Sequence, residues 1–369
     1  MNYKKILTFT ISFLISFSGF SQEAKDRNQE NINVNKFRQL YQEFSTPNMY
    51  RTASGAPGPA YYQQQADYKM DIELDDENKK IYGSETITYT NNSPDNLEYL
   101  WVQLDQNVRK KDSPSLLIDG SGVRPAYAPS GFTKEFLTDP FDGGFNIEYV
   151  VDENNKPLKY IVNQTMMRVD LPSVLKSGEK FSFSIKWWYN IQDHVNQDGR
   201  SGYETFDKDG NRVYIIAQFF PRMAVYNEVE GWQNYQFWGD GEFALPFGNY
   251  DVKITVPSDH ILDATGKLQN RKNIFSKEMI KRFNKAKKTY DKPVMIVTQA
   301  EAEEAEKGFS KKKKTWHFQA ENVRDFAFAT SRKFIWDMMA VKIGDKDVMA
   351  VSMYPKEGNP LWEDYSTVV

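Results

Sequence analysis

The residues of this chain that are able to do chemistry do not fall into a familiar catalytic spacing. Its three histidines, His194, His260 and His317, lie far apart, and none has a second ligand at the spacing that a zinc site requires. We interpret each as a structural or surface histidine. The sequence contains no cysteine and no Gly-x-Ser-x-Gly motif, so it offers neither a thiol nor a serine-elbow nucleophile. No catalytic residue and no metal ligand is assigned to this chain.

Neighbouring carboxylates in the sequence coincide with turn signals. Asp75 and Asp76 open a polar stretch between two apolar patterns, where solvation explains them. Asp207 and Asp209 resemble the start of a calcium loop, but the other ligands of a twelve-residue loop are missing. Asp209 and Gly210 suit a tight turn with positive φ. These acids therefore predict hairpin turns at residues 75–78 and 208–211.

Residues 218–257 have the composition of a binding loop on a rigid β scaffold. The segment begins Gln-Phe-Phe-Pro-Arg, continues through closely spaced tryptophans, glycines and charged residues, and ends in a strand-like stretch at residues 251–256 closed by Pro257. Glycine permits close approach of the backbone, and aromatic side chains supply rigid contact area. The segment holds no set of residues that could catalyse a reaction alone. It therefore predicts a site without its own catalyst.

A mainly β fold is expected to position this segment. Apolar and polar residues alternate from Tyr68, and the alternation returns from Ile81 to Tyr89 after the turn, as in an antiparallel hairpin. Aromatic residues make up 15% of the chain, which favours a β-rich fold with aromatic cross-strand pairs. Further strands are predicted at residues 97–104, 186–189, 262–266, 316–318, 326–329, 333–341 and 348–354. The predicted class is a multi-stranded antiparallel β-sandwich.

Charge patterns predict a small helical insertion in this β domain. Residues 276–289 form a basic helical stretch, and an acidic stretch follows at residues 301–306, which together indicate a solvated surface insertion. The basic run at residues 311–314 is interpreted as a solvated loop rather than a docking patch. At the end of the chain, Asn359 and Pro360 suit an N-cap and a first helical position. Residues 356–369 are therefore expected to start an amphipathic helix that is cut off and leads to a further, α-rich domain.

The N-terminal residues have the pattern of an export signal. Lys4 and Lys5 precede an apolar run at residues 6–20, and small residues Gly19 and Ser21 lie near the expected cleavage point. We expect a signal peptide at residues 1–21, a polar linker or strap at 22–60 with a short helix at 35–44, and a β domain at 61–355. The apolar run is too short for a stable membrane anchor. A net charge of −3 gives no reason to expect a nucleic-acid partner.

Four segments carry a resemblance to a known family. They are residues 214–224 (Tyr-Ile-Ile-Ala-Gln-Phe-Phe-Pro-Arg-Met-Ala), 248–257 (Gly-Asn-Tyr-Asp-Val-Lys-Ile-Thr-Val-Pro), 264–268 (Ala-Thr-Gly-Lys-Leu) and 325–329 (Asp-Phe-Ala-Phe-Ala). In this order the segments resemble the zinc aminopeptidase family of aminopeptidase N and leukotriene hydrolase. The resemblance extends from about Tyr61 to the end of the chain.

The resemblance implies a saddle-shaped, noncatalytic β domain that covers a thermolysin-like catalytic domain. The family's zinc motif, His-Glu-x-x-His with a distal Glu, does not occur in this sequence, so zinc is implied for the parent enzyme and not for this chain. The chain alone is expected to be inactive. In the parent, zinc-polarised water would attack a peptide carbonyl, and a peptide would be the partner.

The resemblance also implies a substrate-binding role for the start of the loop. We expect Gln218, Phe219, Phe220 and Arg222 to line the first substrate pocket. The chain departs from the family at Phe220, where a Gln or Glu would hold the free amine of the substrate, so strict aminopeptidase specificity is not implied. The alternative for these residues is a strand end that plugs a domain interface.

A second interpretation is a self-sufficient secreted binding module. In it, a β-sandwich would recognise glycans through exposed tryptophans, namely Trp187, Trp188, Trp232 and Trp238. Coplanar exposure of these rings on one sheet face would support it.

Overall fold

The computed structural model describes residues 47–115, 126, 128–133, 137, 141–195, 197, 199, 201–239, 244–363 and 365–368. The chain divides into two units, residues 1–61 and 62–369. The expected signal peptide, the expected helix at residues 35–44 and most of the expected linker lie outside the described residues. In the first unit, an antiparallel bridge joins Arg51 to Pro57, and the Arg51 guanidinium lies 5.2 Å from the centroid of the Tyr61 ring.

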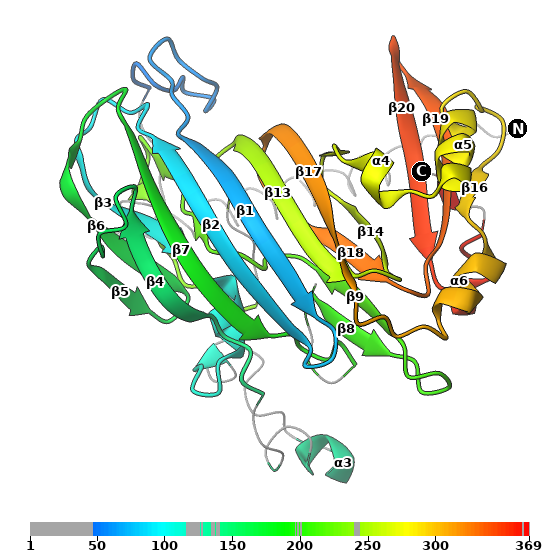
Figure 1. Cartoon of the computed structure of the whole chain (residues 1–369). Helices are drawn as coiled ribbons and strands as arrows, with labels where there is room; N and C mark the ends of the chain where they lie inside the picture. The colour runs from blue at the N-terminus through cyan, green and yellow to red at the C-terminus, as the bar shows by residue number, and fades with distance from the viewer. Residues whose placement is uncertain are drawn as a thin grey trace, which may run out of the picture. The chain divides into compact units, whose positions relative to one another are not determined.

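The second unit is mainly β, as predicted, and its largest sheet has seven strands (Figure 1). In spatial order these are β15 (Lys267–Leu268), β17 (Lys313–Val323), β13 (Gly248–Pro257), β1 (Gln65–Asp75), β2 (Lys80–Thr90), β7 (Lys180–Asn190) and β4 (Asn146–Asp152). The β1–β2 pairing confirms the hairpin predicted around residues 75–78. The sheet is antiparallel, as predicted, except for the pairing of β1 with β13, which run parallel.

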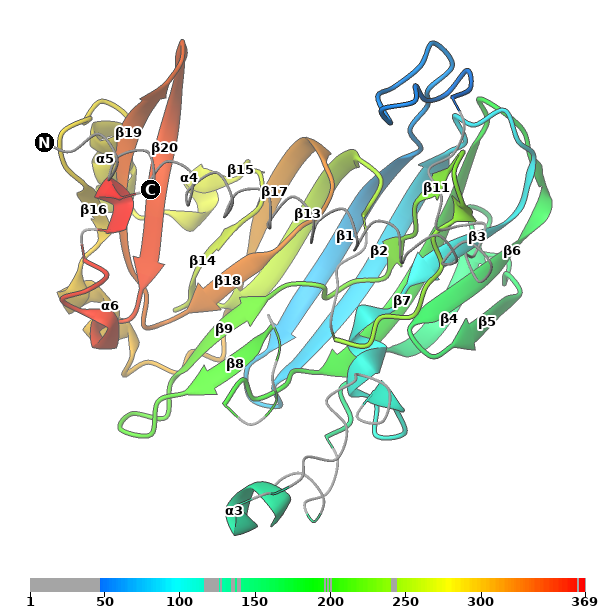
Figure 2. The same ribbon diagram turned by 180° about the vertical axis from the view of Figure 1, so that it is seen from behind.

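Four smaller sheets complete the β structure of the second unit. One four-stranded sheet has the spatial order β10 (Arg222–Met223), β3 (Leu97–Gln103), β6 (Met166–Leu175) and β5 (Tyr160–Asn163). The other has the order β14 (Ile261–Ala264), β18 (Phe328–Ser331), β9 (Arg212–Ile216) and β8 (Gly202–Thr205). A three-stranded sheet contains β16 (Val294–Val297), β19 (Ile335–Ile343) and β20 (Lys346–Tyr354), and a two-stranded sheet contains β11 (Tyr226–Asn227) and β12 (Gly231–Trp232). Both four-stranded sheets lie against one face of the seven-stranded sheet (Figures 1 and 2). The predicted hairpin turn at residues 208–211 joins β8 and β9.

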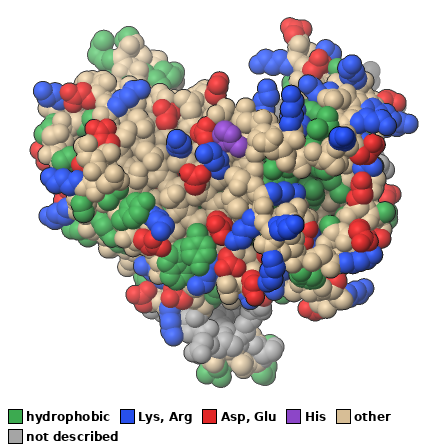
Figure 3. Space-filling model, viewed as in Figure 1, with side chains coloured by type: hydrophobic (Ala, Val, Ile, Leu, Met, Phe, Trp, Pro, Cys, Tyr) green, Lys and Arg blue, Asp and Glu red, His purple; other side chains and the backbone are tan. Residues whose placement is uncertain are grey.

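The core lies between these layers because the strands alternate. Along β1 and β2 every second side chain is buried, as the period of two in a half-buried strand requires. Trp187 of β7 is fully buried, and its cross-strand neighbour on β2 is Gly83. A Cβ atom at Gly83 would lie 2.2 Å from the Trp187 ring, so glycine makes room for the indole. On the opposite face of the sheet, acidic and basic side chains are interspersed (Figure 3).

The predicted helical insertion is present. The described α-helices are α3 (Pro129–Phe132), α4 (Arg271–Ile274), α5 (Lys277–Ala286) and α6 (Gln299–Ala305). Ser276 caps α5 by accepting from the backbone N–H of Met279, and Thr298 and Glu301 form a capping box on α6. Arg282 of the basic helix pairs with Glu301 of the acidic one at 2.6 Å, so the two charge blocks compensate each other.

The helix expected from Asn359 is wrong for the residues described. The chain instead forms two short 3-10 turns, η5 (Lys356–Gly358) and η6 (Tyr365–Thr367). Leu361, Tyr365 and Val368 are 84%, 53% and 76% exposed, so most of the apolar face that was expected to stabilise a helix is in contact with solvent. A helix this short is marginal without such packing, which accounts for the difference. Among the described residues, no helix is both long and apolar enough to cross a membrane.

Candidate functional site

The predicted pocket residues lie in the loop that joins β9 to β10. Gln218 has a backbone φ of 51°, in the left-handed region that few residues other than glycine adopt. Its side chain is partly exposed. Of the four predicted residues, Gln218 is thus the one whose side chain is not buried.

Phe219 and Phe220 do not line a pocket in this structure, which corrects the prediction for both. Each side chain is 0% exposed. The Phe219 ring packs edge-on against Phe328 at a centroid distance of 5.2 Å, and the Phe220 ring packs edge-on against Tyr68 at 5.4 Å. The two rings fill the space between the sheets. Phe220 is therefore part of the core, and this position carries no polar group that could hold a substrate amine.

Arg222 is buried in an ion-pair cluster and is not free to bind a substrate carboxylate. Its Nη2 and Nε donate to the two oxygens of Asp105 at 2.8 and 3.1 Å, and its Nη1 donates to Asp325 at 2.7 Å. Burial alone would lower the pKa of Arg222, but the two carboxylates raise it above its usual value. Arg222 therefore fixes the loop rather than lining it.

The residues that hold this loop were not predicted from the sequence. They belong to a 3-10 turn, η3 (Asp105–Arg109), whose first three side chains are buried although all are polar. The only sequence signal is a polar run shortly after β3, and such a run is equally typical of an exposed turn. Buried polar side chains require partners, and those of η3 come from loops distant in sequence.

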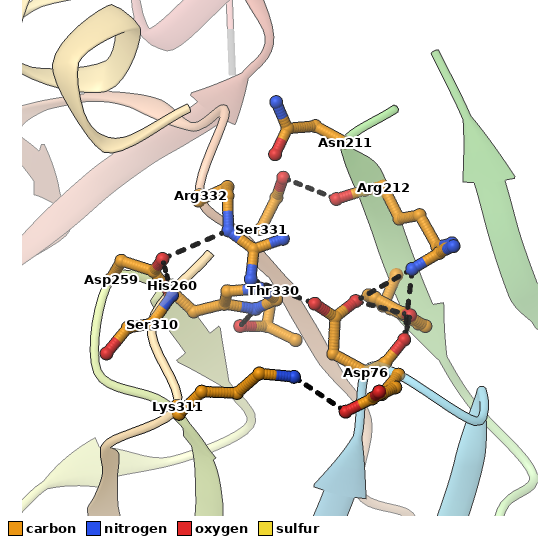
Figure 4. A network of polar contacts seen from close by, with 12 residues as sticks. Asp76, Asn211, Arg212, Asp259, His260, Ser310, Lys311, Thr330, Ser331 and Arg332 are labelled. Atoms are coloured by element: carbon orange, nitrogen blue, oxygen red, sulfur yellow. Dashed lines mark hydrogen bonds and ion pairs between the residues drawn. The ribbon is translucent and has the colours of Figure 1, made fainter. Parts of the chain in front are cut away.

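A second cluster of charged side chains lies where the β1–β2 turn meets residues 309–313 and Arg332 (Figure 4). A cavity of about 450 Å³ is lined there by Asp76, Arg212 and Arg332, among others. The Arg332 side chain is 1% exposed and donates to Asp76 at 2.8 Å and to Asp259 at 3.2 Å. These two ion pairs join the β1–β2 turn to the segment between β13 and β14.

Asp76 is the centre of this network. It accepts hydrogen bonds from the Tyr214 hydroxyl at 2.7 Å and, through its carbonyl oxygen, from Arg212 at 3.0 Å. Burial alone would raise the pKa of Asp76, but Arg332 and Tyr214 hold it below its usual value. The carboxylate is therefore ionised, and its hydrogen bonds and ion pairs are made within the protein. Asp76 thus connects secondary-structure elements.

The basic run at residues 311–314 borders this network and is not uniformly solvated. Lys311 and Lys313 are exposed and pair with Glu77 and Glu73 of the β1–β2 hairpin. In contrast, burial lowers the pKa of Lys314 to about 8. Lys313 and Lys314 therefore begin strand β17, so the prediction of a solvated loop is correct only for the exposed Lys311 and Lys312.

His260 makes the stability of this network dependent on pH. The ring is fully buried, and Nδ1 lies 3.2 Å from the Thr330 hydroxyl. Burial, together with Arg332, lowers the pKa of His260 to about 3. The unfolded chain takes up this proton near pH 6.5, so the stabilisation is complete above that pH and is lost as the pH falls towards 3, at up to about 1.4 kcal/mol per pH unit.

We therefore expect His260→Gln to flatten the fall in the free energy of unfolding between pH 6.5 and 4.5. Urea unfolding at pH 7, 5.5 and 4.5 measures this, with the exposed His194→Gln as the matched control. An unchanged pH dependence in the His260 variant would show that the ring is not held neutral.

The described residues do not fit a zinc site. Of the histidines, His194 is exposed, His260 contacts Thr330, and His317 bonds Asp251 at 2.9 Å, so no two share a centre. One group of three carboxylates has oxygens within 4.8 Å of one another, but these surround the ammonium of a buried lysine, Lys333, at 2.5 to 3.0 Å. Hard carboxylate oxygens around an ammonium are an ion-pair cluster and lack the imidazole ligands of catalytic zinc.

The four tryptophans of the binding-module interpretation do not form one exposed row. Trp187 is buried, and its neighbour Trp188 points to the opposite face, where the Lys80 ammonium lies 4.4 Å from its ring centroid. Trp232 packs against Tyr226 at a centroid distance of 5.2 Å. This geometry removes the main support for glycan recognition by these rings.

No protein-family model matches the chain, and no curated protein matches it. The solved structures that match this chain include zinc metallopeptidases of the M1 type. The M1 zinc metallopeptidase from Deinococcus radiodurans is 11% identical with a TM-score of 0.41, over 81% of this chain and 49% of that one. A mutant of that enzyme is 11% identical with a TM-score of 0.42, over 82% and 50%. The same mutant with a bound Tyr-Ser-Ala substrate gives 11% and 0.42, over 80% and 48%. The chain thus spans about half the length of these structures.

Proposed function

We propose that this chain is the noncatalytic β-rich part of an exported zinc metallopeptidase that acts on the amino-terminal end of peptides. The order of the four family-like segments carries the proposal, and their spatial convergence supports it. Ala264 pairs with Phe328, and Phe328 pairs with Ile216, so three of the four segments meet in one four-stranded sheet. The fourth segment is β13, which pairs with β1 and β17 within the seven-stranded sheet.

In this proposal the zinc ion belongs to another part of the polypeptide. Catalytic zinc needs three protein ligands and an open position for water, and the described residues do not supply them. No step of hydrolysis is therefore assigned to this chain, whose part is to present the Gln218 loop to a peptide. Export rests on the basic and apolar pattern of residues 1–21.

Metal analysis tests whether the zinc ion is bound outside this chain. We expect the purified chain to contain substoichiometric zinc, and a longer polypeptide that extends past Val369 to contain about one zinc ion per chain. The coding sequence beyond residue 369 is expected to contain His-Glu-x-x-His followed by a distal Glu. Stoichiometric zinc in the chain of 369 residues, or a longer reading frame without the motif, would overturn the proposal.

A further inference from the structure

Three consecutive polar side chains of η3 are buried and aim at different segments. Asp105, Gln106 and Asn107 are 2%, 1% and 3% exposed. Polar residues are seldom this deeply buried unless their hydrogen bonds are satisfied. We call these three residues the η3 polar run.

Each member of the η3 polar run holds a loop from elsewhere in the domain. The Asp105 carboxylate holds Arg222. The side-chain amide of Gln106 donates to the carbonyl oxygen of Gln218 at 2.9 Å, and that of Asn107 donates to the carbonyl oxygen of Gln164 at 2.7 Å. The run therefore fixes the Gln218 loop at both ends, once at Gln218 and once at Arg222.

The two glutamines whose carbonyl groups are held share an unusual backbone. Gln218 has φ 51° and Gln164 has φ 53°. A residue with a Cβ atom is disfavoured there and stays only where its surroundings determine the conformation. For Gln218, Gln106 supplies one such contact, and the Ser201 hydroxyl supplies another by accepting from the backbone N–H of Ala217 at 3.2 Å.

The side chain of Gln218 is left available by this arrangement. It is partly exposed, and its amide makes no hydrogen bond to another described residue. Phe219 and Phe220 are in the core, and Arg222 is saturated by two carboxylates. A fixed backbone with a free side-chain amide is the arrangement that pre-organises a binding group.

We infer that Gln106 is a positioning residue, which holds Gln218 in the left-handed conformation and so directs its side-chain amide towards a peptide substrate. This inference rests on the proposed function. Gln106 itself does not touch the substrate. Its effect on binding is therefore transmitted entirely through Gln218.

Non-additivity of two substitutions tests this role in the longer, zinc-containing polypeptide, with aminoacyl anilides as substrates. Gln218→Ala is expected to raise KM about tenfold with little change in kcat, because it removes a binding contact. Gln106→Met keeps the side-chain volume and removes the donor, and we expect it to raise KM about three- to tenfold. In the Gln218→Ala background it should change KM by less than about twofold, because the group it positions is absent.

Two further variants keep the test decisive. Ser201→Ala removes the second contact to the loop and should also raise KM. It keeps the inference testable if the Gln106→Met variant does not fold. Gln319→Leu removes an exposed amide that bonds Asp251 and should leave KM unchanged. Equal effects of Gln106→Met in both backgrounds, or no effect of either loop variant in an active zinc enzyme, would overturn the inference. A longer polypeptide without zinc-dependent hydrolysis would instead overturn the proposed function.

Discussion

Replacing Lys333 with methionine is expected to lower the free energy of unfolding by about 3–5 kcal/mol, because it removes a fully buried ammonium from three carboxylates, of which the buried Glu306 keeps only Lys356 as a counter-ion. The Lys333 side chain is 0% exposed. Its ammonium contacts Asp209 at 2.5 Å and Glu306 and Glu357 at 3.0 Å. An ammonium has three donors, so each carboxylate receives one of them.

The size of this effect follows from the elements that the cluster joins. Asp209 lies in the β8–β9 turn, Glu306 ends α6, and Glu357 lies in η5. Burial alone would lower the pKa of Lys333, but the three carboxylates raise it above its usual value. Without the ammonium, the three carboxylate oxygens, which lie within 4.8 Å of one another, would repel one another, and only Glu306 would keep a lysine partner, Lys356.

Urea unfolding near neutral pH measures the Lys333 effect. Lys342→Met is the matched control, because Lys342 and Asp347 form an exposed pair at 2.8 Å whose loss should cost under about 1 kcal/mol. Adding Glu357→Gln to the Lys333 variant should recover only a small part of the loss, because Glu357 is 34% exposed and water can replace the ammonium there. A cost for Lys333→Met no larger than that of the control would contradict the assigned role.

Replacing Arg222 with methionine is expected to cost a similar 3–5 kcal/mol. The Asp105 side chain is 2% exposed and would be left as an unpaired buried charge. Asp325 is 42% exposed, so water can replace the guanidinium there at a smaller cost. The loss should therefore come mainly from Asp105.

A double substitution separates these contributions. In the Arg222→Met background, Asp105→Asn removes the orphaned charge and should recover stability, whereas Asp325→Asn should recover little. Arg168→Met is the control for arginine removal, because Arg168 pairs with Asp170 on the surface at 2.9 Å. If Asp105→Asn brought no recovery, the buried ion pair would not be the source of the loss.

Much of the fold was predictable because its strands alternate cleanly. Burial alternates in β1, β2 and β13 as the apolar pattern does in the sequence, and Gly210 has the positive φ expected of its turn. The parallel pairing of β1 with β13 was not predictable, since both strands alternate in the same way whichever neighbour they have. The helix at Asn359 failed because capping signals describe how a helix begins, while packing decides whether it persists.

The candidate site was only partly predictable, for a physical reason. The pattern around residues 218–222 locates a loop but does not say which side chains face inwards. Phe220 and Arg222 have opposite chemistry, yet both are buried, one by aromatic packing and the other by ion pairs. Gln106 lies more than a hundred residues from Gln218 in sequence, so only the tertiary structure brings them together.

The measurement that tests the proposed function most directly is peptide hydrolysis by a longer polypeptide that extends past Val369. It should cleave aminoacyl anilides, lose activity with a metal chelator, and regain activity when zinc is added. The chain of 369 residues, assayed in parallel, should remain inactive throughout. Hydrolysis that the chelator does not affect, or robust activity of the shorter chain, would contradict the proposal.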